Sequence, residues 1–125
     1  MQRNERLTWC GVALSGAVTV IIGAYAAHGL GARVSEELVH ATETGVRYQA
    51  WHTLAIMAVL IGQRLFGLKG WGWVAGFWAL GIVGFSGSLY AMAMAGLNLG
   101  VVTPIGGLLL IIGWLSLALV ALRSA

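Results

Sequence analysis

The sequence predicts an all-α membrane protein in which a single domain, residues 1–125, forms a bundle of four transmembrane helices. The first observation is composition: 59% of the residues are hydrophobic and only 9% are charged, whereas a soluble domain carries about 25% charged residues. The second is that the charged residues are scattered and leave long charge-free intervals between them. Together these features exclude a disordered chain, a nucleic-acid-binding module and a conventional cytosolic enzyme.

The first predicted span is the charge-free stretch of 21 residues at positions 7–27. At about 1.5 Å of rise per residue, it can cross the roughly 30 Å hydrocarbon core of a bilayer. A signal peptide is the alternative, with Arg3 and Arg6 as its basic start and Ala24-Tyr25-Ala26 as a cleavage site. The apolar run is longer than the roughly 7–15 residues of a signal peptide, which favours a retained transmembrane helix.

A polar segment, residues 28–49, follows the first span and holds three of the four acidic residues. Ser35 is a good N-cap for Glu36 and Glu37, so the sequence predicts a short amphipathic helical segment between the first two spans. The next apolar run, residues 50–62, is too short to cross a bilayer alone. Either the second span is short, or it begins near residue 43 and ends near residue 63; the second reading is favoured.

The third predicted span is the charge-free stretch 71–95, which Trp71 and Trp73 would anchor at the membrane interface. A glycine-flanked turn at 96–100 leads to the fourth span, 101–122. Thr103 is the expected N-cap of this last helix, with Pro104 at its first helical position. Short connections between four such helices predict a bundle.

The orientation follows from the distribution of basic residues, because cytoplasmic loops are enriched in Lys and Arg. One side of the predicted topology carries five basic residues and the other carries two, Arg33 and Arg47. We therefore expect a multi-pass membrane protein with both termini in the cytoplasm. The five are Arg3, Arg6, Arg64, Lys69 and Arg123.

Small residues form one stripe on the first span and another on the third, which allows close contact between helices. The contact can lie inside one bundle or between subunits, so a homo-oligomer is one expected assembly. The stripes are Gly11, Ser15, Thr19, Gly23 and Ala26, and Gly81, Gly84, Ser88, Ala91 and Ala95.

A polar cluster is expected where the second span begins, at the non-cytoplasmic end of the bundle. Glu43 and Arg47 are four residues apart, as are Tyr48 and His52, so each pair shares a helix face. We expect Arg47 to pair with Glu43 or with a helix C-terminal carbonyl, and His52 to bond Tyr48, Ser86, Tyr90 or backbone. Either these groups only stabilise the bundle, or they bind a ligand. The candidates are His28, Glu43, Arg47, Tyr48, His52, Ser86, Ser88, Tyr90 and Thr103.

The sequence predicts no catalytic residue, no metal site and no cofactor. Three histidines are present, but neither their spacing nor the lone cysteine fits a metal site. The serines of the third span lack the G-x-S-x-G motif of a hydrolase. The basic residues are too scattered for binding a phosphate backbone, so no nucleic-acid partner is expected.

Four ordered motifs carry a family resemblance: Ala-His-Gly-Leu after the first span, Arg-Tyr-Gln-x-x-His at the second, Phe-Ser-Gly-Ser-Leu-Tyr in the third and Thr-Pro-Ile-Gly-Gly at the fourth. In these motifs the chain resembles the domain-of-unknown-function 423 family, the YgdD-like small inner-membrane proteins. The eukaryotic transmembrane protein 256 is similar to them. The resemblance covers essentially the whole chain and implies a four-helix inner-membrane protein, with no activity, substrate or cofactor to transfer.

The expected function is that of a non-enzymatic scaffold or accessory bundle, in contact with the lipid bilayer and with other membrane proteins. The alternative is an oligomeric channel or transporter for a small solute or ion that uses the polar cluster. The sequence leaves open the ligand, the partner proteins, the oligomeric state and whether the polar cluster is structural or functional.

Overall fold

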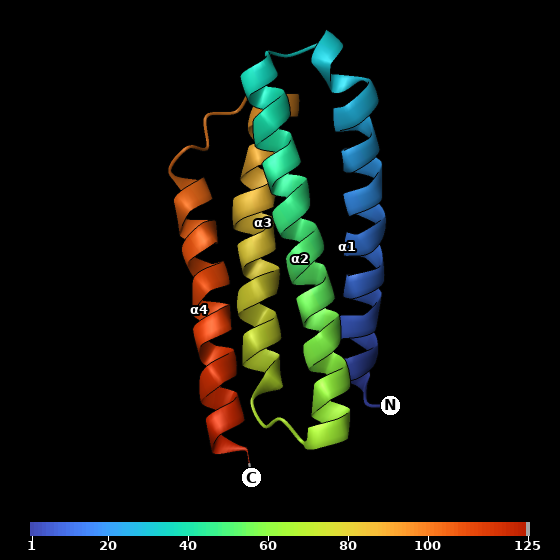
Figure 1. Cartoon of the computed structure of the whole chain (residues 1–125), viewed down its shortest axis with the longest axis vertical. Coiled ribbons are helices and arrows are strands. Elements are labelled where there is room, and N and C mark those ends of the chain that lie inside the picture. Colours follow the sequence, from blue (N-terminus) through green and yellow to red (C-terminus); the bar gives the residue numbers. More distant parts are fainter. Residues whose placement is uncertain (125) are drawn as a thin grey trace.

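A computed structural model describes residues 1–124 of the chain, and its regular structure is entirely helical (Figure 1). The first long helix, α1, rises from the end of the molecule that holds both termini, α2 returns, α3 rises again and α4 returns. This arrangement confirms the all-α class and the antiparallel order of the four segments. The elements are α1 Arg3–His28, the 3-10 turn η1 Leu30–Ala32, α2 Glu36–Phe66, α3 Trp71–Ala95 and α4 Val102–Arg123.

Three of the four long helices, α1, α3 and α4, are long and apolar enough to cross a membrane. The remaining long helix, α2, is long enough, with 31 residues, but its sequence is less apolar than that of the other three. Polar side chains on α2 explain the difference, and four of them point into the protein. Thr42, Gln49, His52 and Thr53 are all buried there.

The prediction of a separate amphipathic helix between the first two spans was wrong. Residues 36–66 form one continuous helix, and only η1 intervenes between it and α1. The expected N-cap is confirmed, because the Ser35 hydroxyl accepts a hydrogen bond from the Leu38 amide at 3.3 Å. No proline interrupts the chain between the cap and Gly67, whose φ of 65° ends the helix. Residues 36–49 of the polar segment are therefore the N-terminal part of α2.

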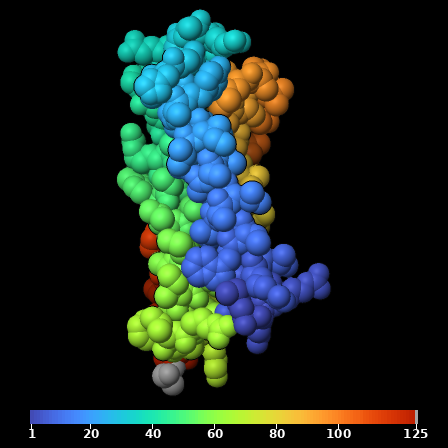
Figure 2. Space-filling model, turned by 90° about the vertical axis from the view of Figure 1, so that its right-hand side faces the viewer, coloured from blue at the N-terminus to red at the C-terminus, as the bar shows by residue number. Residues whose placement is uncertain are grey.

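The helices are arranged so that α2 lies between α1 and α3, and α3 packs against both α2 and α4. The α1 helix packs mainly on α2 and forms one outer side of the molecule, as the space-filling view in Figure 2 shows. The apolar core accordingly lies among the other three helices, around a fully buried Trp78. Its other members are Ile56, Val59, Val74, Ala75 and Leu110.

Glycines bring α3 and α4 into close contact. A Cβ atom placed on Gly106 would lie 2.8 Å from the Cα of Phe85, and one on Gly84 would lie 3.0 Å from the Cα of Gly106. A Cβ on Gly113 would collide with the ring of Trp78. The small-residue stripe of α3 thus lies at a contact within the bundle, where missing side chains let two backbones approach.

The predicted N-cap at Thr103 was wrong, because α4 begins one residue earlier, at Val102. The amides of Val102 and Thr103 both donate to the carbonyl of Leu99, at 3.0 and 3.3 Å, which starts the helical turn before Thr103. Pro104 therefore occupies the third helical position, still within the first turn, where a backbone N–H is not needed. The Thr103 hydroxyl instead contacts α3.

At the end that holds both termini, α1 is joined to α2 by the buried carboxylate of Glu5. Arg64 Nε donates to it at 2.7 Å and Gln63 Nε2 at 2.8 Å, while the backbone amide of Gln2 donates at 3.1 Å. Glu5 precedes the apolar stretch that begins at Leu7. The Gln2 amide bond, followed by the bonds from Arg64 and Gln63, lowers the pKa of this carboxyl below its usual range, although desolvation opposes the shift.

Candidate functional site

The predicted polar residues separate into distinct groups because each helix directs them toward a different neighbour. One group joins α1, α2 and α3, a second joins α2 to α4, and a third ties α3 to the helices on either side of it. The remaining residues lie on the surface at the end opposite the termini. The sequence alone does not predict this grouping, because it depends on which faces of the helices pack together.

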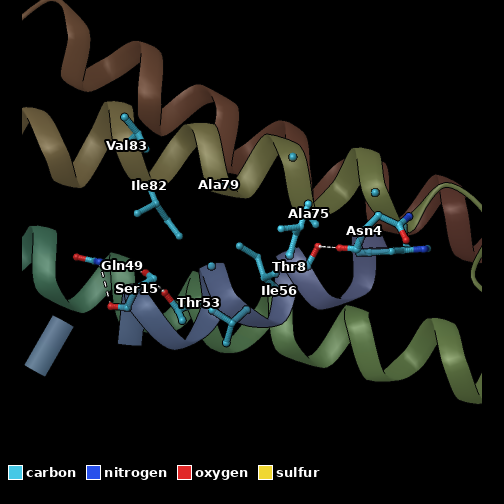
Figure 3. Close-up of a pocket in the computed structure, with 16 residues that line it drawn as sticks. Asn4, Thr8, Ser15, Gln49, Thr53, Ile56, Ala75, Ala79, Ile82 and Val83 are labelled. Carbon is cyan, nitrogen blue, oxygen red and sulfur yellow. Dashed lines mark hydrogen bonds between the residues drawn. The ribbon is translucent and has the colours of Figure 1, made fainter. Parts of the chain in front are cut away.

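The first group is centred on Gln49, whose side chain is buried between α1 and α3. Its amide nitrogen donates to the hydroxyl of Ser15 at 3.1 Å and to the Ser15 carbonyl at 3.2 Å (Figure 3). Its amide oxygen accepts from the Tyr90 hydroxyl at 2.6 Å. The Thr53 hydroxyl lies 2.6 Å from that of Ser15. Three helices are thus connected through one chain of hydrogen bonds, in which the buried polar atoms satisfy one another.

The second group consists of His52 and Trp114, which connect α2 to α4. His52 is buried, and its Nδ1 lies 2.7 Å from the carbonyl of Tyr48, one helical turn earlier. Its Nε2 lies 2.9 Å from the indole nitrogen of Trp114. A carbonyl can only accept and an indole N–H can only donate. The ring therefore carries its proton on Nδ1 and accepts at Nε2, and the expected bond from His52 to Tyr48 or backbone is confirmed.

Aromatic rings surround His52. The Trp114 ring centre lies 5.8 Å from that of His52 and 4.6 Å from that of Trp78. Tyr48 stacks on His52 with a centre distance of 6.2 Å and contacts Phe85 at 5.0 Å. Such pairs stabilise a buried site beyond the area they cover. The imidazole is therefore held by packing as well as by its two hydrogen bonds.

The third group consists of the serines of α3. Ser86 is fully buried, and its hydroxyl donates to the carbonyl of Gly45 on α2 at 2.6 Å. The Ser88 hydroxyl lies 2.6 Å from that of Thr103 on α4. Both serines therefore make hydrogen bonds between helices, which is the role expected of small hydroxyls at helix contacts in membranes.

The three remaining candidates, His28, Glu43 and Arg47, are exposed. Glu43 and His28 line a shallow cavity of about 470 Å³ at the end opposite the termini. The expected pairing of Arg47 with Glu43 was wrong, since no ion pair involves Arg47 in residues 1–124. The ion pair on this part of α2 instead joins His40 Nε2 to Glu36 Oε1 at 3.6 Å. Exposed i, i+4 pairs contribute only about 0.3–0.5 kcal/mol, so spacing alone does not fix one.

Two open grooves lie beside these hydrogen-bonded groups. The α1–α3 groove, about 650 Å³, runs between α1 and α3 and reaches α2 at Gln49, Thr53 and Ile56 (Figure 3). The α2–α4 groove, about 820 Å³, is lined by His52, its aromatic neighbours and the exposed Leu108. Within the described chain, no three His, Cys, Asp or Glu side chains gather as metal ligands would. Both grooves are mainly apolar.

Sequence reasoning missed several residues that make these contacts. Gln49 stood in the quoted Arg-Tyr-Gln-x-x-His motif but was not a candidate, and Trp114 and Glu5 were not considered as polar groups. A usable signal existed for Gln49 and Thr53, because they are four residues apart and share a face with Gly45. Ser15 lies 34 residues from its partner Gln49, and Trp114 lies 62 residues from its partner His52. No local sequence pattern could identify pairs so far apart in the chain.

Comparisons with known proteins agree with the fold and with the motifs. The family described as "Protein of unknown function (DUF423)" matches residues 22–107. A UPF0382 membrane protein of Haemophilus influenzae is 43% identical over 123 residues, which cover 98% of this chain and 97% of the relative. The UPF0382 inner membrane protein YgdD of Escherichia coli is 40% identical over 113 residues, 89% of this chain and 86% of the relative.

A UPF0382 membrane protein of Staphylococcus epidermidis is 39% identical over 116 residues, covering 90% of this chain and 93% of the relative. No solved structure matches the fold. The resemblance seen in the four motifs is therefore confirmed, and the membrane character of the chain is shared with its relatives. The chain belongs to the DUF423 family of membrane proteins.

Proposed function

We propose that this protein crosses the bacterial inner membrane four times, with both termini in the cytoplasm. Three helices are apolar enough to span. Because α1 and α3 run in the same direction, the chain between them has to return across the membrane, and α2 is the one long helix in residues 29–70 (Figure 1). The buried side chains of Gln49, His52 and Thr53 on α2 bond to neighbouring helices, so they would not face lipid. The name of the Escherichia coli relative supports the location.

The topology predicts that a reporter active only after export stays silent when fused after Ala125, because five of the seven basic residues lie on the side of the termini. The same reporter inserted next to Gly31, in the connection between α1 and α2, is expected to be active. Alkaline phosphatase activity in intact cells measures both. Activity of the C-terminal fusion would contradict the proposed orientation.

We further propose that the protein is a non-enzymatic scaffold or accessory bundle for other membrane components. One observation carries this proposal: the side chains of Gln49, His52 and Ser88 are buried and hydrogen-bonded to neighbouring helices, while the grooves beside them are mainly apolar. A solute carrier or an enzyme needs polar groups that are free to meet a substrate. A scaffold needs a stable shape and apolar contact surface, which this arrangement supplies.

Site-specific photocrosslinking in living cells tests the scaffold against the oligomeric channel or transporter. A photoreactive residue replaces Leu108, which lines the α2–α4 groove, or Leu14, which is exposed but lies outside both grooves. The scaffold predicts a discrete adduct with a different membrane protein at Leu108 and none at Leu14. An adduct made only of copies of this chain, together with ion conductance of the purified protein in planar bilayers, would favour the channel instead.

A further inference from the structure

We propose that the α1–α3 groove holds one acyl chain of an anionic phospholipid, whose phosphate lies at the end of the groove next to Arg3 and Asn4. This assignment goes beyond the scaffold role and rests on the proposed topology, in which α1 and α3 span the membrane and the termini lie in the cytoplasm. Three features of the groove support it: its length, its lining and the charge at its mouth.

The groove has the length of one leaflet. On α1 it extends from Asn4 to Ser15, and on α3 from Trp71 to Val83. Helical stretches of 12 and 13 residues rise about 17–18 Å, a little more than half of the roughly 30 Å hydrocarbon core. A transmembrane helix of another protein would need a surface that continues across both leaflets. A lipid acyl chain needs only the half that this groove provides.

The groove exists because side chains are missing from both of its walls. Gly11 on α1 and Gly76 on α3 line it, and a Cβ atom added to either would meet nothing within 4 Å. At the inner end the polar atoms of Ser15 and Thr53 are bonded to each other at 2.6 Å. A hydrocarbon chain that reaches this end therefore leaves none of these hydroxyls without a partner.

The mouth of the groove is polar and basic. Arg3 lies one helical turn before the lining residue Leu7, so it occupies the same face of α1 at the membrane boundary. Asn4 lines the mouth, and its side-chain oxygen accepts from the Glu5 amide at 2.9 Å, which leaves the nitrogen end of the amide for a ligand. Trp71 lies opposite on α3, at the depth where tryptophan meets lipid headgroups.

The nearby acidic group does not neutralise this mouth. Glu5 is buried against Arg64, whereas Arg3 is exposed and has no ion pair within the described residues. The cytoplasmic leaflet carries the anionic lipids, and basic pockets between membrane helices on that side bind acidic headgroups. The free cation at the mouth thus selects a lipid with a net negative headgroup over a zwitterionic one.

Native mass spectrometry of the full-length protein in mild detergent tests the proposal. The probes are phosphatidylglycerol and phosphatidylcholine with identical palmitoyl and oleoyl chains, added at equal concentration. We expect one phosphatidylglycerol bound per chain, in preference to phosphatidylcholine. Gly11→Leu and Gly76→Leu fill the groove and are expected to reduce the bound lipid at least tenfold. Gly16→Leu and Gly87→Leu, where a Cβ also meets nothing within 4 Å, lie outside the groove and are expected to retain it.

Headgroup selection is tested separately with Arg3→Gln, which keeps the groove and removes the charge. A basic residue near the membrane surface contributes about 1 kcal/mol to binding acidic lipid, so the preference for phosphatidylglycerol should fall about fivefold. Arg123→Gln, at the same end of the molecule but on α4, is the matched control and should leave it unchanged. Melting temperatures in the same detergent confirm that each variant is folded.

Three results would overturn the proposal. Equal lipid retention by all four leucine variants would show that the groove is not the site. Equal binding of the two lipids by the wild-type protein would remove the role of the basic mouth. Loss of a dimer, and not of a lipid adduct, in Gly11→Leu and Gly76→Leu would identify the groove as a contact with a second copy of this chain.

Discussion

Gly106→Ala is expected to lower the free energy of unfolding by about 3 kcal/mol, at the upper end of the usual cost of overpacking. The added methyl group would overlap the backbone of Gly84 and Phe85 on α3. A flexible side chain could rotate away, but a helix backbone cannot, so α3 and α4 would have to separate. Separation would also loosen the neighbouring contact of Gly113 with Trp78, which depends on the same approach.

The matched control for Gly106 is Gly87→Ala. Gly87 lies in the middle of α3, but a Cβ atom there meets nothing within 4 Å. Alanine has a higher helix propensity than glycine by up to about 1 kcal/mol, so this change should be neutral or slightly stabilising. Reversible unfolding in mixed detergent micelles measures both variants. Equal destabilisation of the two would mean that the close contact between α3 and α4 is absent in solution.

The apolar pattern predicted the helices well because lipid demands long charge-free stretches. The third span was expected at 71–95, and α3 is Trp71–Ala95. The first was expected at 7–27, whereas α1 begins at Arg3, because Gln2 and Glu5 form a capping box that extends the helix beyond the apolar stretch. Helix ends that depend on caps, as here, extend past what hydrophobicity alone defines.

For the contacts inside the bundle, the type of interaction could be predicted from the sequence, but the pairs of residues could not. Buried hydroxyls and a buried histidine were expected to bond across helices, and Ser86, Ser88 and His52 do so. Their partners could not be deduced, because which faces meet depends on how α2 lies between α1 and α3. The pair of Arg47 and Glu43 was expected from the spacing but does not form. Both side chains are exposed, and favourable spacing on one helix does not outweigh the solvation of two charges.

The His52→Ala substitution is expected to lower the free energy of unfolding by about 3 kcal/mol. It removes a buried ring that packs between Tyr48 and Trp114, and it leaves the indole N–H of Trp114 without its acceptor at 2.9 Å. Each lost aromatic pair costs about 0.5–1.5 kcal/mol, and a donor left unpaired away from water costs roughly 1–3 kcal/mol. His28→Ala, on the exposed surface, is the control and should change stability by less than about 0.5 kcal/mol.

A double-mutant cycle with Trp114→Phe isolates the bond between the two rings. Hydrogen bonds between membrane helices contribute about 0.6 kcal/mol on average and up to about 1.7 kcal/mol. The bond joins two helices and its His52 end is buried among aromatic rings, so the coupling energy should lie toward the upper value. A coupling energy near zero would mean that the two side chains act independently and that the bond does not form.

The chemistry of the histidine ring separates a structural His52 from one that serves a ligand. Because Tyr48 offers a carbonyl and Trp114 an N–H, the resting ring must carry its proton on Nδ1. Nitrogen-15 chemical shifts of the labelled ring in nanodiscs should report that tautomer. Trp114→Phe should shift the Nε2 signal, because Nε2 loses its donor, while the Tyr48 carbonyl keeps the proton on Nδ1. If any cellular phenotype of His52→Ala then follows protein abundance, the cluster is structural. Loss of the phenotype at normal abundance and stability would identify His52 as part of a binding site.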